Sequence, residues 1–352
     1  MRKKINWHEV RKVLVVRLRS IGDTVLTTPS LISLKKFLPD AQIDILVEDW
    51  VAPVLDNFDS VGRVLSVTKD PNDRISLARK IRKEKYDVAF NLHGGTTSTF
   101  FVRVSGARHR VGYQDYQFSF LYNHLLSSAS EFWGKDKTHS AEQQMALLGF
   151  VGVPVDDLPK TRLVVTEGEL ESLAEKITAE AQRRGEDFSG LLNNFALLHP
   201  VAAFETKQWA TENFASVAEF LNERNLKVIA IATKKERDVL ARLEELSKGS
   251  ILTVDNLKLP EITALASKAD LFVGNDSGIA HIAAAVGTPS VVIFGSSNRD
   301  HWHPWTDAPN EIVYEEFPCQ PCAGYVCEEF GEPQCIISVK SENVIAAVKK
   351  LT

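Results

Sequence analysis

The residues best suited to chemistry lie in the segment Leu271–Ser297, which reads LFVGNDSGIAHIAAAVGTPSVVIFGSS. The pattern predicts a short apolar strand, a polar turn, a helix of small residues and a second buried strand. The turn contains Asp276, Ser277 and Gly278, at a place where backbone N–H groups and a helix N-terminus bind phosphate. Because Asp276 is an acid in an anion-binding turn, we expect a ligand that offers hydroxyls as well as phosphate, as a nucleotide sugar does.

Two further candidates follow buried strands. Asp23 stands where the first strand gives way to a helix, and a carboxylate there can accept a proton from an acceptor hydroxyl. The alternative is that Asp23 only caps the helix. Lys207 lies in the loop after the strand over 195–198, where a cation can neutralise a diphosphate leaving group, although it can also be a solvated surface lysine. A single glycine near Asp23 does not make the G-x-G-x-x-G dinucleotide fingerprint.

Small residues and histidines surround the polar turn. His281 lies five residues beyond Asp276, where it serves either the ligand or the helix core. Gly295 opens a loop of small donors that can complete a phosphate site. His301 and His303 resemble a metal pair only weakly, because no carboxylate stands at helical spacing from them.

All four cysteines lie within one short segment. Cys319 and Cys322 form a C-x-x-C pair, followed by Cys327 and Cys335. Four thiols so close together can build a tetrahedral site for structural zinc or iron. Free buried cysteines and a redox pair are the alternatives, and disulfides are not expected in a reducing cytoplasm.

The elements that position these residues form two successive series of strands and helices. This alternation predicts an α/β fold of two doubly wound domains facing a central cleft. We expect the first domain over residues 1–170 and the second over 190–340, with a hinge within 165–194. The first series is predicted to contain strands over 13–18, 43–47, 63–67 and 87–92, helices over 24–38, 75–85 and 138–149, and a loop over 109–115.

The second series ends in the segment that carries the turn. It is predicted to contain strands over 195–198, 227–232 and 251–254, with helices over 211–224, 235–246 and 261–267. A charged helix predicted over 170–184 precedes this series, near the domain boundary. A last helix, expected over 341–351, has an apolar face at Val344, Ile345 and Val348. We expect this C-terminal segment, 341–352, to pack back on the first domain.

Composition narrows the class of protein. The chain has 352 residues, 44% hydrophobic and 25% charged, with a net charge of −5. This balance gives no pull toward nucleic acid. No apolar run approaches the ~20 residues that span a bilayer. The basic N-terminus lacks the apolar core of a signal peptide, so we expect a cytoplasmic protein with no transmembrane segment.

In sequence order, these motifs resemble glycosyltransferase family 9, the heptosyltransferases of lipopolysaccharide core assembly. The resemblance covers about residues 13–351, and the Asp-Ser-Gly-x-x-His segment with the following Phe-Gly strand end is its most specific part. The matching motifs are Ser20-Ile21-Gly22-Asp23, Lys85-Tyr86-Asp87, Ser105-Gly106-Ala107, Val111-Gly112-Tyr113, His199-Pro200, Lys207-Gln208-Trp209, Gly274-Asn275-Asp276-Ser277-Gly278, His281 and Phe294-Gly295.

The resemblance implies a GT-B fold of two Rossmann-like domains and an inverting transfer from ADP-L-glycero-D-manno-heptose without a catalytic cofactor or metal. Asp23 would be the base, and Lys207 would hold the diphosphate. The donor nucleotide sugar would be bound by Asp276, Ser277, Gly278, His281, Gly295 and Glu236. Some relatives that modify proteins hold iron in a cysteine-bearing C-terminal segment.

The acceptor implied by the resemblance is a lipooligosaccharide core at the inner membrane surface, which would make the protein cytoplasmic and peripheral. Arginines can meet its anionic groups, although several can simply be solvated. The candidates are Arg17, Arg19, Arg103, Arg108 and Arg110. The alternatives are a GT-B transferase that uses another nucleotide sugar and a non-catalytic nucleotide-sugar-binding protein.

Overall fold

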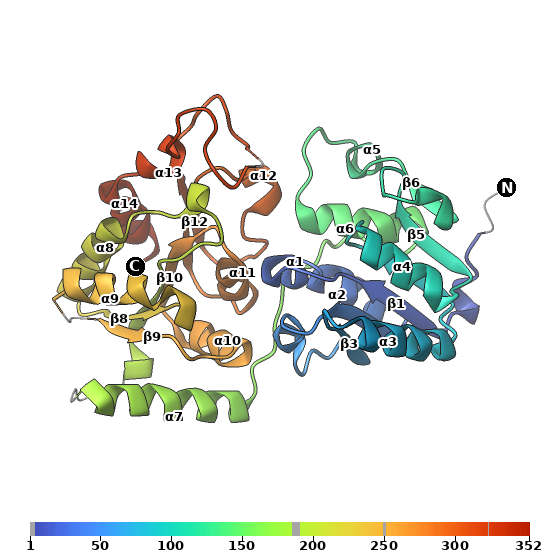
Figure 1. Ribbon diagram of the computed structural model, residues 1–352, viewed down its shortest axis with the longest axis horizontal. Helices are drawn as coiled ribbons and strands as arrows, with labels where there is room; N and C mark the ends of the chain where they lie inside the picture. The colour runs from blue at the N-terminus through green and yellow to red at the C-terminus, as the bar shows by residue number, and fades with distance from the viewer. Residues whose placement is uncertain (1–3, 185–190, 249–250, 323) are drawn as a thin grey trace. The chain divides into compact units, whose positions relative to one another are not determined.

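A computed structural model describes residues 4–184, 191–248, 251–322 and 324–352 (Figure 1). The chain divides into two compact units, Met1–Val164 and Val165–Thr352. Within the described residues each unit contains one six-stranded sheet in which every neighbouring pair is parallel. The predicted α/β class is confirmed.

The first sheet has the strand order β3-β2-β1-β4-β5-β6. Chain order reverses between β1 and β4, and ligands bind doubly wound sheets at the carboxyl ends of the strands beside such a switch. The strands are β1 (Lys12–Val16), β2 (Gln42–Glu48), β3 (Arg63–Val67), β4 (Val88–Asn91), β5 (His109–Tyr113) and β6 (His124–Leu126).

Helices connect these strands, with α3 and α4 lying side by side (Figure 1). Leu14, Val16, Phe101 and Val102 belong to the core between β1 and α4. The helices are α1 (Ile21–Val25), α2 (Thr28–Phe37), α3 (Pro71–Glu84), α4 (Thr96–Ser105), α5 (Ala129–Trp133) and α6 (Ser140–Phe150), with 3-10 turns η1 (Trp7–Glu9), η2 (Ala52–Leu55) and η3 (Ser119–Leu121).

Two predictions for the first unit were wrong. The single helix expected over 24–38 is two helices, because Pro29 lies in the first turn of α2, where proline is tolerated, and cannot sit inside a continuous helix. The segment 109–115, expected as a loop, forms β5, which pairs on both sides with β4 and β6. The polar and aromatic residues of this segment lack the apolar pattern of a buried strand. It is a strand because it pairs with β4 and β6.

The second sheet has the order β12-β11-β10-β7-β8-β9, so its switch lies between β10 and β7. The second buried strand predicted after the polar turn is confirmed, over 290–294. The strands are β7 (Phe195–His199), β8 (Lys227–Ile231), β9 (Leu252–Val254), β10 (Leu271–Asn275), β11 (Ser290–Phe294) and β12 (Asn310–Tyr314).

The helices of the second unit include α7, which we had expected to fall between the domains. Leu173, Ile177 and Ala181 of α7 are buried, and Lys176 forms an ion pair of 2.6 Å with Glu261 of α10. The helices are α7 (Glu167–Arg184), α8 (Thr211–Glu223), α9 (Arg237–Leu246), α10 (Leu259–Lys268), α11 (Gly278–Ala285), α12 (Arg299–Trp302), α13 (Gln334–Ile337) and α14 (Ser341–Leu351), with η4 (Leu191–Asn193), η5 (Glu205–Lys207) and η6 (Lys234–Glu236).

The C-terminal helix α14 corrects another expectation. Its apolar residues Val344, Ala347 and Val348 join the core of the second unit, against α8, β11 and β12. We had expected the helix on the first domain. The covered apolar face accounts for its position. Among the described residues, no helix combines the length and apolar character needed to cross a bilayer.

Candidate active site

Asp23 lies beyond the carboxyl end of β1, in the first turn of α1. Its carboxylate accepts hydrogen bonds from the Ser20 backbone N–H (2.9 Å) and hydroxyl (3.2 Å), which closes a capping box. It also forms an ion pair with Arg17. Burial opposes the charged form, but the charge of Arg17 and the bonds from Ser20 and Arg17 outweigh it, so the pKa of Asp23 is lowered. Asp23 is therefore both a helix cap and an ionised carboxylate at the switch point.

Arg17, one of the predicted acceptor arginines, is bonded to other groups of the first unit, and its contact with an acceptor stays a prediction. Its side chain is 12% exposed, and its guanidinium donates to the carbonyl of Leu92 and to Asp23. It therefore connects the carboxyl ends of β1 and β4. Arg19 lies at the same edge and is exposed. Contact between Arg19 and an acceptor stays a prediction.

The other three predicted acceptor arginines do not lie with Asp23. Arg103 is near the end of α4, and Arg108 and Arg110 stand at the start of β5. Because the sheet is parallel, the start of β5 is on the opposite edge from the end of β1. The structure thus separates these arginines from Asp23 by the length of the strands.

His93 is a candidate that the sequence reasoning missed. It follows β4, and the side chain of Asn91 accepts hydrogen bonds from the backbone N–H groups of His93 (3.0 Å) and Gly94 (3.1 Å). Burial, followed by the positive charge of Arg17, lowers the pKa of His93 to about 4. The negative charge of Asp23 acts in the opposite direction. A polar His-Gly-Gly run directly after a buried strand was the signal that could have revealed it.

The second unit brings two predicted residues, Lys207 and Asp276, together with Ser297 in one chain of contacts. The ammonium of Lys207 donates to a carboxylate oxygen of Asp276 at 2.7 Å, and the hydroxyl of Ser297 donates to the same oxygen at 2.5 Å. Asp276 is 6% exposed, and Lys207 also lies over the ring of Phe204. Lys207 is therefore a positioned cation and not a solvated lysine.

Ser277 and Glu236 lie around His199, which ends β7. Ser277 is the N-cap of α11, and its hydroxyl lies 3.2 Å from Nδ1 of His199. Burial lowers the pKa of His199 to about 4, while the nearby charge of Glu236 acts in the opposite direction. Glu236 accepts bonds from the backbone N–H (3.0 Å) and hydroxyl (2.7 Å) of Thr233. This edge therefore presents a neutral imidazole, a hydroxyl and a carboxylate beside the β7–β10 switch.

The remaining residues predicted to bind the donor nucleotide sugar are Gly278, His281 and Gly295. Gly278 begins α11 and is half-buried, whereas His281 is buried within the helix. Gly295 has a packing reason for being glycine, because a Cβ there would lie 2.2 Å from the carbonyl oxygen of Thr206. This close approach joins the end of β11 to η5 and so sets Ser297 beside Lys207.

The cysteine segment packs on the same strand end. The amide of Gln320 donates to the Gly295 carbonyl at 2.6 Å, and the backbone N–H of Cys322 donates to the Ser296 carbonyl at 2.9 Å. All four cysteines are free thiols. Burial, with contributions from the other three thiols, raises the pKa of Cys335 to about 11. Among the described residues, no group of three or more histidine, cysteine or acidic side chains is arranged to hold a metal ion.

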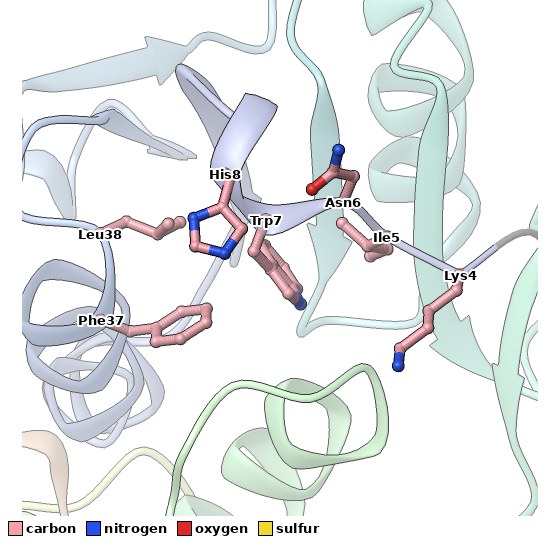
Figure 2. A pocket seen from close by; sticks show the side chains of 7 residues that line it. All are labelled: Lys4, Ile5, Asn6, Trp7, His8, Phe37 and Leu38. Carbon is pink, nitrogen blue, oxygen red and sulfur yellow. The ribbon is translucent and has the colours of Figure 1, made fainter.

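A cavity of about 530 Å³ lies elsewhere, at the amino edge of the first sheet (Figure 2). It is formed between the segment before β1 and the end of α2. The rings of Trp7 and Phe37 pack edge to face, with centroids 5.5 Å apart. Because Asp23 lies at the other edge, we do not assign the cavity to the active site.

Comparison with known proteins identifies the family. Residues 74–331 match the model of glycosyltransferase family 9 (heptosyltransferase). The chain belongs to glycosyltransferase family 9. It is similar to lipopolysaccharide heptosyltransferase 3 of Escherichia coli, with 29% identity over 95% of this chain and 97% of the relative. This family 9 chain is therefore a glycosyltransferase, as predicted.

Solved structures resemble the family 9 chain in fold. A family 9 glycosyltransferase from Veillonella parvula has a TM-score of 0.80 at 19% identity, covering 100% of this chain and 98% of that one. The Escherichia coli ADP-heptose lipopolysaccharide heptosyltransferase II has a TM-score of 0.75 at 21% identity, covering 97% and 98%. The predicted GT-B fold is confirmed.

Proposed function

We propose that this family 9 enzyme transfers heptose from ADP-L-glycero-D-manno-heptose to a lipopolysaccharide core acceptor, with inversion at the anomeric carbon. The observation that carries the proposal is the arrangement at the two switch points. An ionised carboxylate, Asp23, stands at the first, and the half-buried Lys207, bonded to the buried Asp276 and Ser297 pair, stands at the second. The similarity to lipopolysaccharide heptosyltransferase 3 supports the choice of sugar and acceptor.

The donor is held by the edge that carries Lys207. The first turn of α11, at Ser277 and Gly278, binds the diphosphate through backbone N–H groups. Lys207 neutralises the charge that develops on the leaving diphosphate. Asp276 accepts hydrogen bonds from sugar hydroxyls, and Glu236 accepts them from the nucleoside.

Asp23 acts on the acceptor. Its carboxylate takes the proton of the acceptor hydroxyl as that oxygen bonds to the anomeric carbon, and the bond from this carbon to the diphosphate oxygen breaks. The electron pair of the broken bond leaves with the nucleotide. Because Arg17 keeps Asp23 ionised, the base is ready at neutral pH.

The proposal is tested by the choice of nucleotide and by one substitution. We expect ADP to raise the thermal unfolding temperature, and UDP and GDP to leave it unchanged, because only a ligand of the folded state stabilises it. Asp23→Asn should bind ADP normally and lose about 10²–10⁴-fold in transfer rate. Asp73→Asn, another acid in a first helical turn, is the matched control.

Two results would contradict this function. Stabilisation by UDP alone would replace the ADP donor by another nucleotide sugar. Transfer that continues unchanged in Asp23→Asn would reject Asp23 as the base. ADP binding without transfer by the wild type, over a range of core acceptors, would favour the non-catalytic binding protein.

We also propose that the enzyme works in the cytoplasm, peripherally at the inner membrane, since its acceptor is a membrane lipid. The cysteine segment is proposed as a site for structural zinc or iron. The mutual influence of the four thiols supports it, and the thiols must draw together and lose protons on binding. Metal analysis of the wild type and Cys322→Ser decides, because an ion absent from both would end this idea.

A further inference from the structure

The amino edge of the first sheet, and the loop over 114–123 that leads back to it from β5, carry exposed aromatic and basic side chains that the proposed chemistry does not use. Phe118 and Phe120 are 46% and 78% exposed, and their rings pack edge to face with centroids 6.2 Å apart. Four arginines lie on the neighbouring segments. We call the set the aromatic-basic patch; its members are Phe118, Phe120, Arg82, Arg103, Arg108 and Arg110.

Hydrogen bonds and close approaches connect the residues of the patch. Arg110 donates to the carbonyls of Leu121 and Ala107, both at 2.7 Å, which joins the η3 segment to the start of β5. Burial and then the charge of Arg103 lower the pKa of Arg110, so these two cations are neighbours. A Cβ on Gly106 would lie 1.5 Å from a terminal nitrogen of Arg82, which places that guanidinium over the end of α4.

The patch keeps its positive charge. Of the carboxylates in the described part of the chain, none forms an ion pair with Arg82, Arg103 or Arg108. Glu84, the acid at the end of α3, is already paired with Lys12 and Arg63, each at 2.8 Å. A cationic region therefore stands out on a chain whose net charge is −5.

The aromatic part is held in place by its own loop. Phe118 has φ 62°, in the left-handed region that bulky residues rarely adopt. The hydroxyl of Tyr116 donates to the Asn91 carbonyl at 3.1 Å, and the amide of Asn91 donates to the hydroxyl of Tyr122 at 2.6 Å. The loop is thus anchored on both sides of two exposed phenyl rings. Exposed apolar groups rimmed by charge mark interaction sites.

We propose that the aromatic-basic patch docks the protein on an anionic bilayer surface. The two phenyl rings enter the interfacial layer, and the arginines bind lipid phosphates. Acidic phospholipids attract clusters of arginine. Burial of the two phenyl rings in the interfacial layer adds a hydrophobic contribution to binding. Arg108 and Arg110 lie at the opposite edge of the sheet from Asp23, because they stand at the start of β5 whereas Asp23 follows the end of β1.

This inference rests on the proposed function only for the nature of the acceptor, and its test needs no transfer. The full chain is sedimented with phosphatidylcholine vesicles that do or do not contain phosphatidylglycerol. We expect binding only to the anionic vesicles, falling as salt is raised. Phe118→Ser/Phe120→Ser and Arg103→Glu/Arg108→Glu should each bind roughly tenfold more weakly.

The controls separate docking from folding and from chemistry. Lys268→Glu/Ile337→Ser changes one exposed cation and one exposed apolar residue in the second unit and should bind like the wild type. Phe120→Ser alone, at the most exposed ring, serves if the double variants have lowered unfolding temperatures. Wild-type protein that ignores anionic vesicles, or patch variants that bind them unchanged, would overturn the docking surface. That result would leave the proposed donor unaffected, because ADP-induced stabilisation is measured separately and without vesicles.

Discussion

Arg17 and Asp23 form an ion pair at the point where the strand order of the first sheet reverses, with Arg17 also bonded to the end of β4. The pair decides the protonation state of the proposed base. Burial alone would raise the pKa of Asp23, and Arg17 is the largest influence in the other direction. The cation is therefore a positioning residue for the base.

Removing this cation should move the acidic limb of the pH profile. In Arg17→Met the burial of Asp23 remains and the opposing charge is lost, so the pKa of Asp23 rises. Since the base works only when ionised, kcat/KM should begin to fall at a higher pH than in the wild type. Arg17→Lys, which keeps a charge, should lie between the two. A limb that stays in place in Arg17→Met would show that Asp23 is not the titrating group.

Lys207 and Asp276 should act as a coupled pair. Lys207→Met should lower kcat by about 10²-fold or more, because the leaving diphosphate loses its cation. Asp276→Asn should mainly weaken donor binding. Since the two side chains are in direct contact, the losses in the double variant should not add. Steady-state kinetics of both single variants and the double variant checks this, and strict additivity would contradict the pairing.

Gly295 should tolerate no side chain. Gly295→Ala places a methyl group against the Thr206 carbonyl, a backbone atom that cannot move aside. We expect a loss of about 1–3 kcal/mol in the free energy of unfolding and weaker ADP binding, because η5 carries Lys207. Gly168→Ala, where the added methyl group meets no atom within 4 Å, is the control and should keep or slightly raise stability, because residue 168 lies in α7. Denaturant unfolding of both variants is the measurement; equal stabilities would refute the close approach.

His93 should make stability depend on pH. Its pKa is about 4 in the folded protein and near 6.5 when unfolded. Between these values the unfolded chain gains a proton that the folded protein does not, so stability falls as pH falls from about 6.5 toward 4. His93→Gln should lose less stability over that range, as thermal unfolding at several pH values would show. Parallel curves for the two proteins would mean that His93 is not held neutral.

The second switch point is recognisable in the sequence because glycine, acid and hydroxyl stand directly between a strand and a helix. Asp276 and Ser277 were identified by that rule, and Lys207 by its place in the loop after the strand over 195–198. The sequence could not show that Ser297 bonds to Asp276, because that contact depends on how tightly the end of β11 approaches η5.

The first unit was harder because β5 was interpreted as a loop. With that strand missing, Arg103, Arg108 and Arg110 could be assigned to the acceptor, whereas a strand that starts at His109 places them at the amino edge. Arg17 and Asp23 are six residues apart, and the chain between them must turn for the two side chains to meet. The hydrophobic pattern of the sequence does not predict this turn. His93 was overlooked for the same reason, since its pKa arises from neighbours on other strands.

The cysteine segment is hydrogen-bonded to the carbonyls of Gly295 and Ser296. The next residue, Ser297, is the one that bonds to Asp276. A modification of those thiols that moves the segment would therefore disturb Gly295 and Ser296, which precede Ser297 directly in the chain. An alkylating reagent, a peroxide or an ion that rearranges the segment should therefore change the affinity for the sugar nucleotide without touching it. Protein handled without a reductant would then give different constants from protein kept reduced.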